Sequence, residues 1–150
     1  MLMNHMRIAP FVLEDFEPIS QLFCKVYKET YPFFDDQFFR LERFRDILTH
    51  HVLPKCSLLT VKSNEELVGF MAWNNQEIDQ LYIKSNFRGK GIGSYLITIA
   101  QTQTNHLRLY TLASNEKAIR FYQRRGFEII HKGIAPDEQV PDVMMQWQRY

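Results

Sequence analysis

Residues Asn86 to Leu96 read NFRGKGIGSYL, which places three glycines directly before a stretch with helical apolar spacing. Gly89, Gly91 and Gly93 carry no side chain, so the backbone N–H groups are what this segment offers to a ligand. A helix N-terminus adds free N–H donors and partial positive charge. The segment therefore predicts a turn that receives an anion.

The spacing of this turn excludes two common phosphate-binding loops. A P-loop needs a glycine five residues before Gly89, where this chain has Lys84. It also needs Ser or Thr after its lysine, whereas Gly91 follows Lys90 here. A dinucleotide-binding loop would carry its third glycine at Ser94 and would follow the first strand. The sequence therefore supports neither a magnesium-nucleotide site nor a nicotinamide or flavin cofactor.

The elements that must hold the turn alternate along the chain, with no internal repeat and no linker. Short apolar runs predict strands, and apolar residues at three- and four-residue spacing predict helices. Ser114 or Asn115 caps the last helix, and Gly126 stops it. Strands are predicted over residues 6–12, 57–62, 66–73, 77–83, 107–112, 127–130 and 143–148, and helices around the apolar positions of 16–26, 41–48, 92–100 and 118–122. This order predicts an α+β or mixed α/β fold.

The composition fits one ordinary domain, residues 1–150, with 45% apolar and 23% charged residues. No apolar run approaches the about 20 residues that cross a bilayer, and the N-terminus lacks a signal-peptide pattern. We therefore expect a cytoplasmic protein without a membrane partner. Cys24 and Cys56 have no metal-type spacing, so we interpret both as buried thiols and expect no metal.

The charge is distributed unevenly although its total is only +1. Residues 84–132 hold nine basic and two acidic side chains, whereas residues 1–83 hold eight basic and twelve acidic ones. Either the second half binds a polyanion or the excess is an ordinary solvated face. The near-zero total argues against a nucleic-acid-binding module.

Two motifs resemble signatures of one family. Arg88, Gly91 and Gly93 resemble the acyl-CoA-binding pattern Q/R-x-x-G-x-G/A of the GNAT superfamily of N-acetyltransferases. Residues 115–127 resemble a second pattern of that family, N-x-x-A-x-x-F-Y-x-x-x-G-F. The second pattern is matched by Asn115, Ala118, Phe121, Tyr122, Gly126 and Phe127. The resemblance thins before residue 57, where only the layout of a strand and two helices is shared.

The resemblance implies a central mixed, mostly antiparallel sheet of about seven strands flanked by about four helices. It also implies an acyltransferase that uses acetyl-CoA as co-substrate, in which a primary amine of a small molecule or peptide attacks the thioester directly. The alternatives are a coenzyme A-binding regulator without turnover and an enzyme specific for peptide N-termini or lysines. A homodimer stays open.

The resemblance further implies which residues contact coenzyme A. The turn and the helix that follows it suit the diphosphate without a metal ion, and a strand would pair with the pantetheine amides. The alternative for that strand is pairing within the sheet alone. The implied contacts are Leu81, Tyr82, Ile83, Arg88, Gly89, Lys90, Gly91, Ile92, Gly93, Ser94, Asn115, Lys117 and Tyr122.

Direct attack requires a group that accepts the proton of the amine and one that protonates the leaving thiolate. Glu77 and Asp79 stand two apart on one predicted strand and therefore face one side, so either is a candidate base; the alternative is that they are surface acids or ion-pair partners. Tyr122 is the candidate acid, since a phenol with a pKa near 10 protonates a basic sulfur. The alternative is that Tyr122 is a core aromatic.

The acceptor side is expected between the first two helices. An aromatic and acidic cluster over residues 31–39 would suit a cation with an apolar body, and Tyr31 and Phe34 are its candidate wall residues. Trp73 is a further candidate. The alternative for the cluster is a hydrophobic hinge between helices, in which two acids act as caps.

Overall fold

The computed structural model describes residues 5–149, so residues 1–4 and 150 of the predicted domain lie outside the described range. The order of elements is the predicted one. The strands are β1 (Met6–Pro10), β2 (Ser57–Ser63), β3 (Glu66–Trp73), β4 (Ile78–Ile83), β5 (His106–Leu112), β6 (Glu128–Ile134) and β7 (Pro141–Gln148). The helices are α1 (Phe16–Thr30), α2 (Leu41–Ile47), α3 (Ile92–Thr102) and α4 (Glu116–Gln123). No helix within residues 5–149 is long and apolar enough to cross a membrane.

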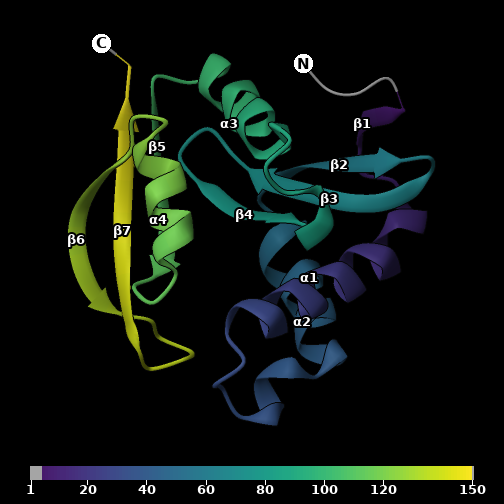
Figure 1. The fold of residues 1–150 in the computed structure, drawn as a ribbon, viewed down its shortest axis with the longest axis horizontal. Coiled ribbons are helices and arrows are strands. Elements are labelled where there is room, and N and C mark those ends of the chain that lie inside the picture. Colours follow the sequence, from purple (N-terminus) through teal and green to yellow (C-terminus); the bar gives the residue numbers. More distant parts are fainter. Residues whose placement is uncertain (1–4, 150) are drawn as a thin grey trace.

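The seven strands form two sheets, which the sequence did not predict. One sheet has the order β1-β2-β3-β4 and the other β5-β7-β6, and every neighbouring pair within them is antiparallel. A single parallel bridge, between Glu77 and Arg108, joins the sheets just before β4. Beyond that bridge β4 and β5 diverge and are not paired (Figure 1).

The helices cover the sheets from opposite sides. In Figure 1, α1 and α2 lie below the four-stranded sheet and α3 lies above it. Two core clusters follow this division: one joins α1 and α2 to the sheet around Phe44 and Phe70, and the other joins α3 and α4 around Leu96 and Phe127. β4 contributes to both clusters, with Leu81 in the second and Tyr82 in the first. It therefore forms a wall between the two sides of the molecule.

Three local predictions need correction. The first strand ends at Pro10, because Leu13–Asp15 form a 3-10 helix in which the Asp15 carboxylate accepts from the Val12 N–H at 3.0 Å. The α-helical part of the second helix ends at Ile47. The chain then forms a π-helical turn from Leu48 to Val52, before Pro54. Cys24 and Cys56 are only half-buried, because both lie at the edge of the core.

Candidate active site

A cavity of about 90 Å³ lies where β4 and β5 diverge. It brings together parts of the chain that are remote in sequence: the end of α1, both strands, and the first turns of α4. Six of the predicted site residues meet there: Tyr31, Asp79, Leu81, Tyr82, Asn115 and Tyr122. Its full lining is Tyr31, Ile78, Asp79, Gln80, Leu81, Tyr82, Leu109, Tyr110, Thr111, Asn115, Ala118 and Tyr122.

The glycine turn has the conformation that an anion site needs. Gly89 and Gly91 have φ angles of 76° and 84°, in the left-handed region, and Gly91 is the N-cap of α3. Among residues 5–149, the N–H groups from Gly89 to Ser94 donate to no protein acceptor; the first intrahelical donor is Tyr95, to the Gly91 carbonyl at 3.0 Å. A Cβ added at Gly89 or Gly91 would point into open space. These donors are therefore left unpaired by the protein, and the binding of an anion to them stays a prediction.

Gly93 has a different reason to be glycine. A Cβ at this position would lie 2.9 Å from Cζ of Phe121 on α4. Gly93 therefore lets α3 and α4 approach closely, and this contact ties the helix that follows the turn to the helix that carries Tyr122.

We expect Gly93→Ala to destabilise the fold by about 1–3 kcal/mol, because the added methyl group overpacks the contact between α3 and α4. Thermal unfolding measures the loss. The double variant Gly93→Ala, Phe121→Leu should recover part of it, since the smaller side chain makes room for the methyl group. If the single variant were as stable as the native chain, this packing role would be wrong.

The basic residues of the turn are held near its mouth. Arg88 Nε donates to the Ile83 carbonyl at 3.0 Å, which fixes the guanidinium at the end of β4. The Lys90 ammonium lies 5.5 Å from the centre of the Phe87 ring. Lys117 is exposed in the first turn of α4. All three leave their positive charge at the surface, where a diphosphate would approach.

Tyr122 is buried, and its ring contacts those of Phe121 and Phe127 at centroid distances of 5.2 and 5.7 Å. Its hydroxyl has no hydrogen-bond partner among residues 5–149, yet it is not among the fully buried atoms that lack one. The hydroxyl is therefore accessible from the cavity. Burial, and then the nearby Tyr31, raise the pKa of Tyr122 well above the usual tyrosine value. A phenol of this kind keeps its proton at neutral pH and can donate it.

Asn115 joins the start of α4 to the end of α1. Its side-chain oxygen accepts from the Ala118 N–H at 3.2 Å, which confirms the predicted cap. Its amide nitrogen donates to the Tyr31 hydroxyl at 3.1 Å. Burial raises the pKa of Tyr31, so this hydroxyl also stays protonated. The sequence suggested Tyr31 only as a wall residue and missed this contact, since no local pattern links positions 84 apart.

β4 presents a free edge to the cavity. Its ladder with β3 pairs Leu81 with Met71 and Tyr82 with Phe70. On the other side no strand within residues 5–149 pairs with Leu81, Tyr82 or Ile83, because pairing with β5 is limited to the bridge at Glu77. An extended ligand can therefore add to this edge by main-chain hydrogen bonds.

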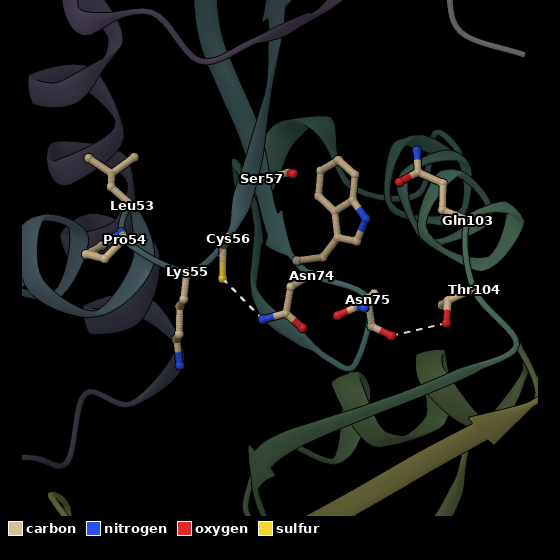
Figure 2. Close-up of a pocket in the computed structure, with 10 residues that line it drawn as sticks. Leu53, Pro54, Lys55, Cys56, Ser57, Asn74, Asn75, Gln103 and Thr104 are labelled. Carbon is tan, nitrogen blue, oxygen red and sulfur yellow. Dashed lines mark hydrogen bonds between the residues drawn. The ribbon is translucent and has the colours of Figure 1, made fainter.

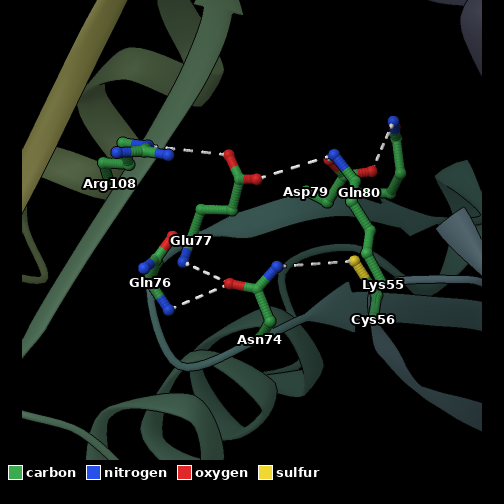
Figure 3. Close-up of polar contacts among 8 residues, drawn as sticks. All are labelled: Lys55, Cys56, Asn74, Gln76, Glu77, Asp79, Gln80 and Arg108. Atoms are coloured by element: carbon green, nitrogen blue, oxygen red, sulfur yellow. Dashed lines mark hydrogen bonds and ion pairs between the residues drawn. The ribbon is translucent and has the colours of Figure 1, made fainter. Parts of the chain in front are cut away.

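The two candidate acids do lie together, in a cluster of opposite charges (Figure 3). Lys55 Nζ is 3.7 Å from Glu77 Oε1 and 3.3 Å from Asp79 Oδ1. Arg108 Nε, on β5, is 3.8 Å from Glu77 Oε2. Ala72 of β3 pairs with Gln80 of β4, and the next residue, Trp73, pairs with Ile78. Asp79 is therefore an extra, unpaired residue in a β-bulge. Of the two acids, Asp79 is the one that lines the cavity with Tyr122.

Trp73 is not brought to this cavity. It lines a larger one, of about 450 Å³, formed where β2 begins and β3 and α3 end. Figure 2 shows Cys56 and Asn74 facing each other there, with Asn74 Nδ2 3.9 Å from the sulfur. Burial is the largest cause that raises the pKa of Cys56, to about 11.

Of the aromatic cluster over residues 31–39, only Tyr31 lines the cavity of Tyr122. Phe34 is half-buried and packs on Tyr27 and Phe38, at ring distances of 6.1 and 5.2 Å. The Tyr27 hydroxyl donates to Glu138 at 2.6 Å, which connects α1 to the loop before β7. Phe34, Phe38 and Phe39 thus pack as the hinge interpretation expects, whereas Phe33 is exposed. The capping part of that interpretation needs correction, because Asp35 precedes the 3-10 helix Asp36–Phe39 without a side-chain cap bond.

Known proteins resemble the chain over most of its length. The model of the family described as "Acetyltransferase (GNAT) family" matches residues 16–127. The peptidyl-lysine N-acetyltransferase YjaB of Escherichia coli (strain K12) is 28% identical over 125 residues, which is 83% of each protein. The protein of the same name from Salmonella typhimurium (strain LT2) is 32% identical over 91 residues, covering 60% of this chain and 63% of the relative.

Solved structures show the same fold. The solution structure of apo YjaB from Escherichia coli superposes with a TM-score of 0.79 at 23% identity, over 100% of both chains. The PaiA N-acetyltransferase of Thermoplasma acidophilum, solved in complex with coenzyme A, gives a TM-score of 0.70 at 19% identity, over 95% of this chain and 98% of that one. These likenesses show the fold, and the match over residues 16–127 establishes that the chain belongs to the GNAT family of acetyltransferases.

Proposed function

We propose that the protein transfers an acetyl group from acetyl-CoA to a primary amine, by direct attack of the amine within a ternary complex. One observation carries the proposal: the open edge of β4 lines the same cavity as Tyr122, and the chain runs from the end of β4 through the glycine turn to the free N–H donors at the start of α3. Membership of the acetyltransferase family supports the same reaction.

The residues present fit acetyl-CoA, which supplies the activated acetyl group. The N–H groups from Gly89 to Ser94 bind the diphosphate, and the positive end of α3 adds to the attraction. Arg88 and Lys90 contribute fixed charge beside it. The open edge of β4 from Leu81 to Ile83 orients the pantetheine arm along the cavity.

Two groups move protons in this reaction. A primary alkylamine has a pKa near 10.4, so presenting it as the neutral nucleophile at pH 7 costs about 4–5 kcal/mol. Asp79, directly or through water with Glu77, accepts that proton, since Asp79 lines the cavity. Tyr122 donates its proton to the sulfur as the thiolate leaves.

We propose a lysine side chain, free or in a peptide, as the acceptor. The relatives in Escherichia coli and Salmonella typhimurium are named peptidyl-lysine N-acetyltransferases. The acids Glu77 and Asp79 beside the cavity suit an amine that arrives protonated. Tyr31 provides an aromatic surface for its aliphatic stem.

A thiol-release assay tests the function. Acetyl-CoA is offered with a lysine peptide, a peptide whose only amine is its N-terminus, and a set of small amines. We expect release of coenzyme A with the lysine peptide and a mass gain of one acetyl group on the lysine. Binding of acetyl-CoA in a thermal-shift titration without acetylation of any amine would instead indicate a regulator that only binds coenzyme A.

A further inference from the structure

Lys55 lines the larger cavity and contacts both candidate acids. Its ammonium stands between the carboxylates of Glu77 and Asp79, and Asp79 also lines the cavity of Tyr122 (Figure 3). The acids are well buried, with side chains 17% and 16% exposed, whereas the Lys55 side chain is 51% exposed. The lysine therefore reaches the acids from the solvent side, as a substrate lysine would.

The contacts of Lys55 are weak enough to be exchanged. Its two distances, 3.7 and 3.3 Å, are longer than the about 2.7–2.9 Å of a charge-assisted hydrogen bond. By contrast, Lys62 Nζ is 2.9 Å from Asp15 in a pair whose two side chains are both largely buried. An ion pair with one exposed partner contributes little stability.

Lys55 also sets the charge that an incoming amine meets. With Arg108 on the other side of Glu77, the cluster holds two carboxylates and two cations, so its formal charge is zero. Partial burial would lower the pKa of Lys55, but the attraction of Asp79 and Glu77 outweighs it and raises the pKa. Lys55 therefore stays charged, and a cationic acceptor meets neutralised acids until Lys55 moves away.

We propose that Lys55 is a specificity-determining residue of the acceptor site: its ammonium holds the position of the acceptor's ammonium, and the acceptor binds by displacing it. This inference rests on the proposed function, because it assumes that the cavity receives an amine acceptor. It concerns only the binding of that acceptor and not the transfer of the acetyl group. Cationic amines can replace Lys55 between the two acids, whereas neutral molecules of the same shape leave it in place.

The test measures binding to the protein loaded with coenzyme A, so that it does not depend on turnover. The probe is Nα-acetyl-lysine amide, titrated by NMR. The control ligand is its uncharged analogue, Nα-acetyl-norleucine amide. Lys55→Met keeps most of the stem and removes the charge, which gives the cluster a net negative charge. We expect the dissociation constant of the lysine probe to fall about three- to tenfold and that of the norleucine probe to stay the same.

Two further variants sharpen the result. Lys55→Arg keeps the charge, and its guanidinium can bind the carboxylates in a bidentate manner. The probe displaces it less easily, so the lysine probe should bind more weakly than to the native protein. Arg7→Met removes an exposed ion pair with Glu65, remote from the cavity, and should leave both dissociation constants unchanged. Thermal unfolding of each variant verifies that it is folded.

The outcomes separate this inference from the proposed function. An unchanged or larger dissociation constant of the lysine probe in Lys55→Met overturns the inference, as does equal tightening for the norleucine probe or no binding of the lysine probe to either protein. If the lysine probe binds more tightly to the variant while neither protein acetylates any amine, the inference holds and the proposed function fails.

Discussion

Tyr122→Phe should lower the turnover number by about 10²–10⁴-fold, the usual contribution of a well-placed general acid. The phenol is the one proton donor of α4 that lines the cavity, and its hydroxyl has no partner among residues 5–149 that would hold it for a structural purpose. The ring is kept by the substitution, so its packing on Phe121 and Phe127 persists. Steady-state kinetics with a lysine peptide measure the loss.

The affinity for coenzyme A should be unchanged in Tyr122→Phe, which separates proton transfer from binding. Tyr95→Phe is the matched control, since Tyr95 is an exposed residue of α3 and its loss of a hydroxyl should leave turnover as it is. Because burial raises the pKa of Tyr122, its proton is retained at pH values where an exposed tyrosine begins to lose it. Turnover should therefore not decline at alkaline pH through this group up to about pH 10. Native turnover in Tyr122→Phe would remove the phenol from the mechanism.

Gly91→Val should weaken the binding of coenzyme A by at least about tenfold. The φ angle of 84° is in the region that β-branched residues avoid, at a cost of about 1–2 kcal/mol. The new side chain would also occupy the open space above the free N–H donors, where the diphosphate is expected. Calorimetric titration with coenzyme A measures the dissociation constant.

The backbone strain of this substitution needs its own control. Asn64, in the turn between β2 and β3, has a φ angle of 50° and is exposed. Asn64→Val therefore introduces similar strain far from the glycine turn, and it should reduce stability without changing the affinity for coenzyme A. Should both variants bind coenzyme A as the native chain does, the glycine turn would not be the diphosphate site.

Local features of the site could be predicted from the sequence because they depend on neighbouring residues. The left-handed turn at Gly89 and Gly91 follows from glycine spacing before a helical pattern. The cap by Asn115 follows from the preference of its side chain for the first N–H groups of a helix. Alternating and helical apolar periods set the order of all eleven main elements. The family motifs lie in these local segments, so the chemistry could be predicted as well.

Contacts between remote segments were decided only by the tertiary structure. The division into two sheets arises because β4 and β5 touch at one bridge and then diverge, and no pattern within either strand encodes that divergence. The approach of Tyr31 to Asn115 and of Lys55 to Glu77 and Asp79 depends on how α1, α2 and the sheet pack. The sequence thus determined which groups are the candidates for the chemistry, since residue type and local spacing are enough for that. The residues that these groups contact depend on side-chain packing across the whole core. Local spacing in the sequence carries no information on that packing.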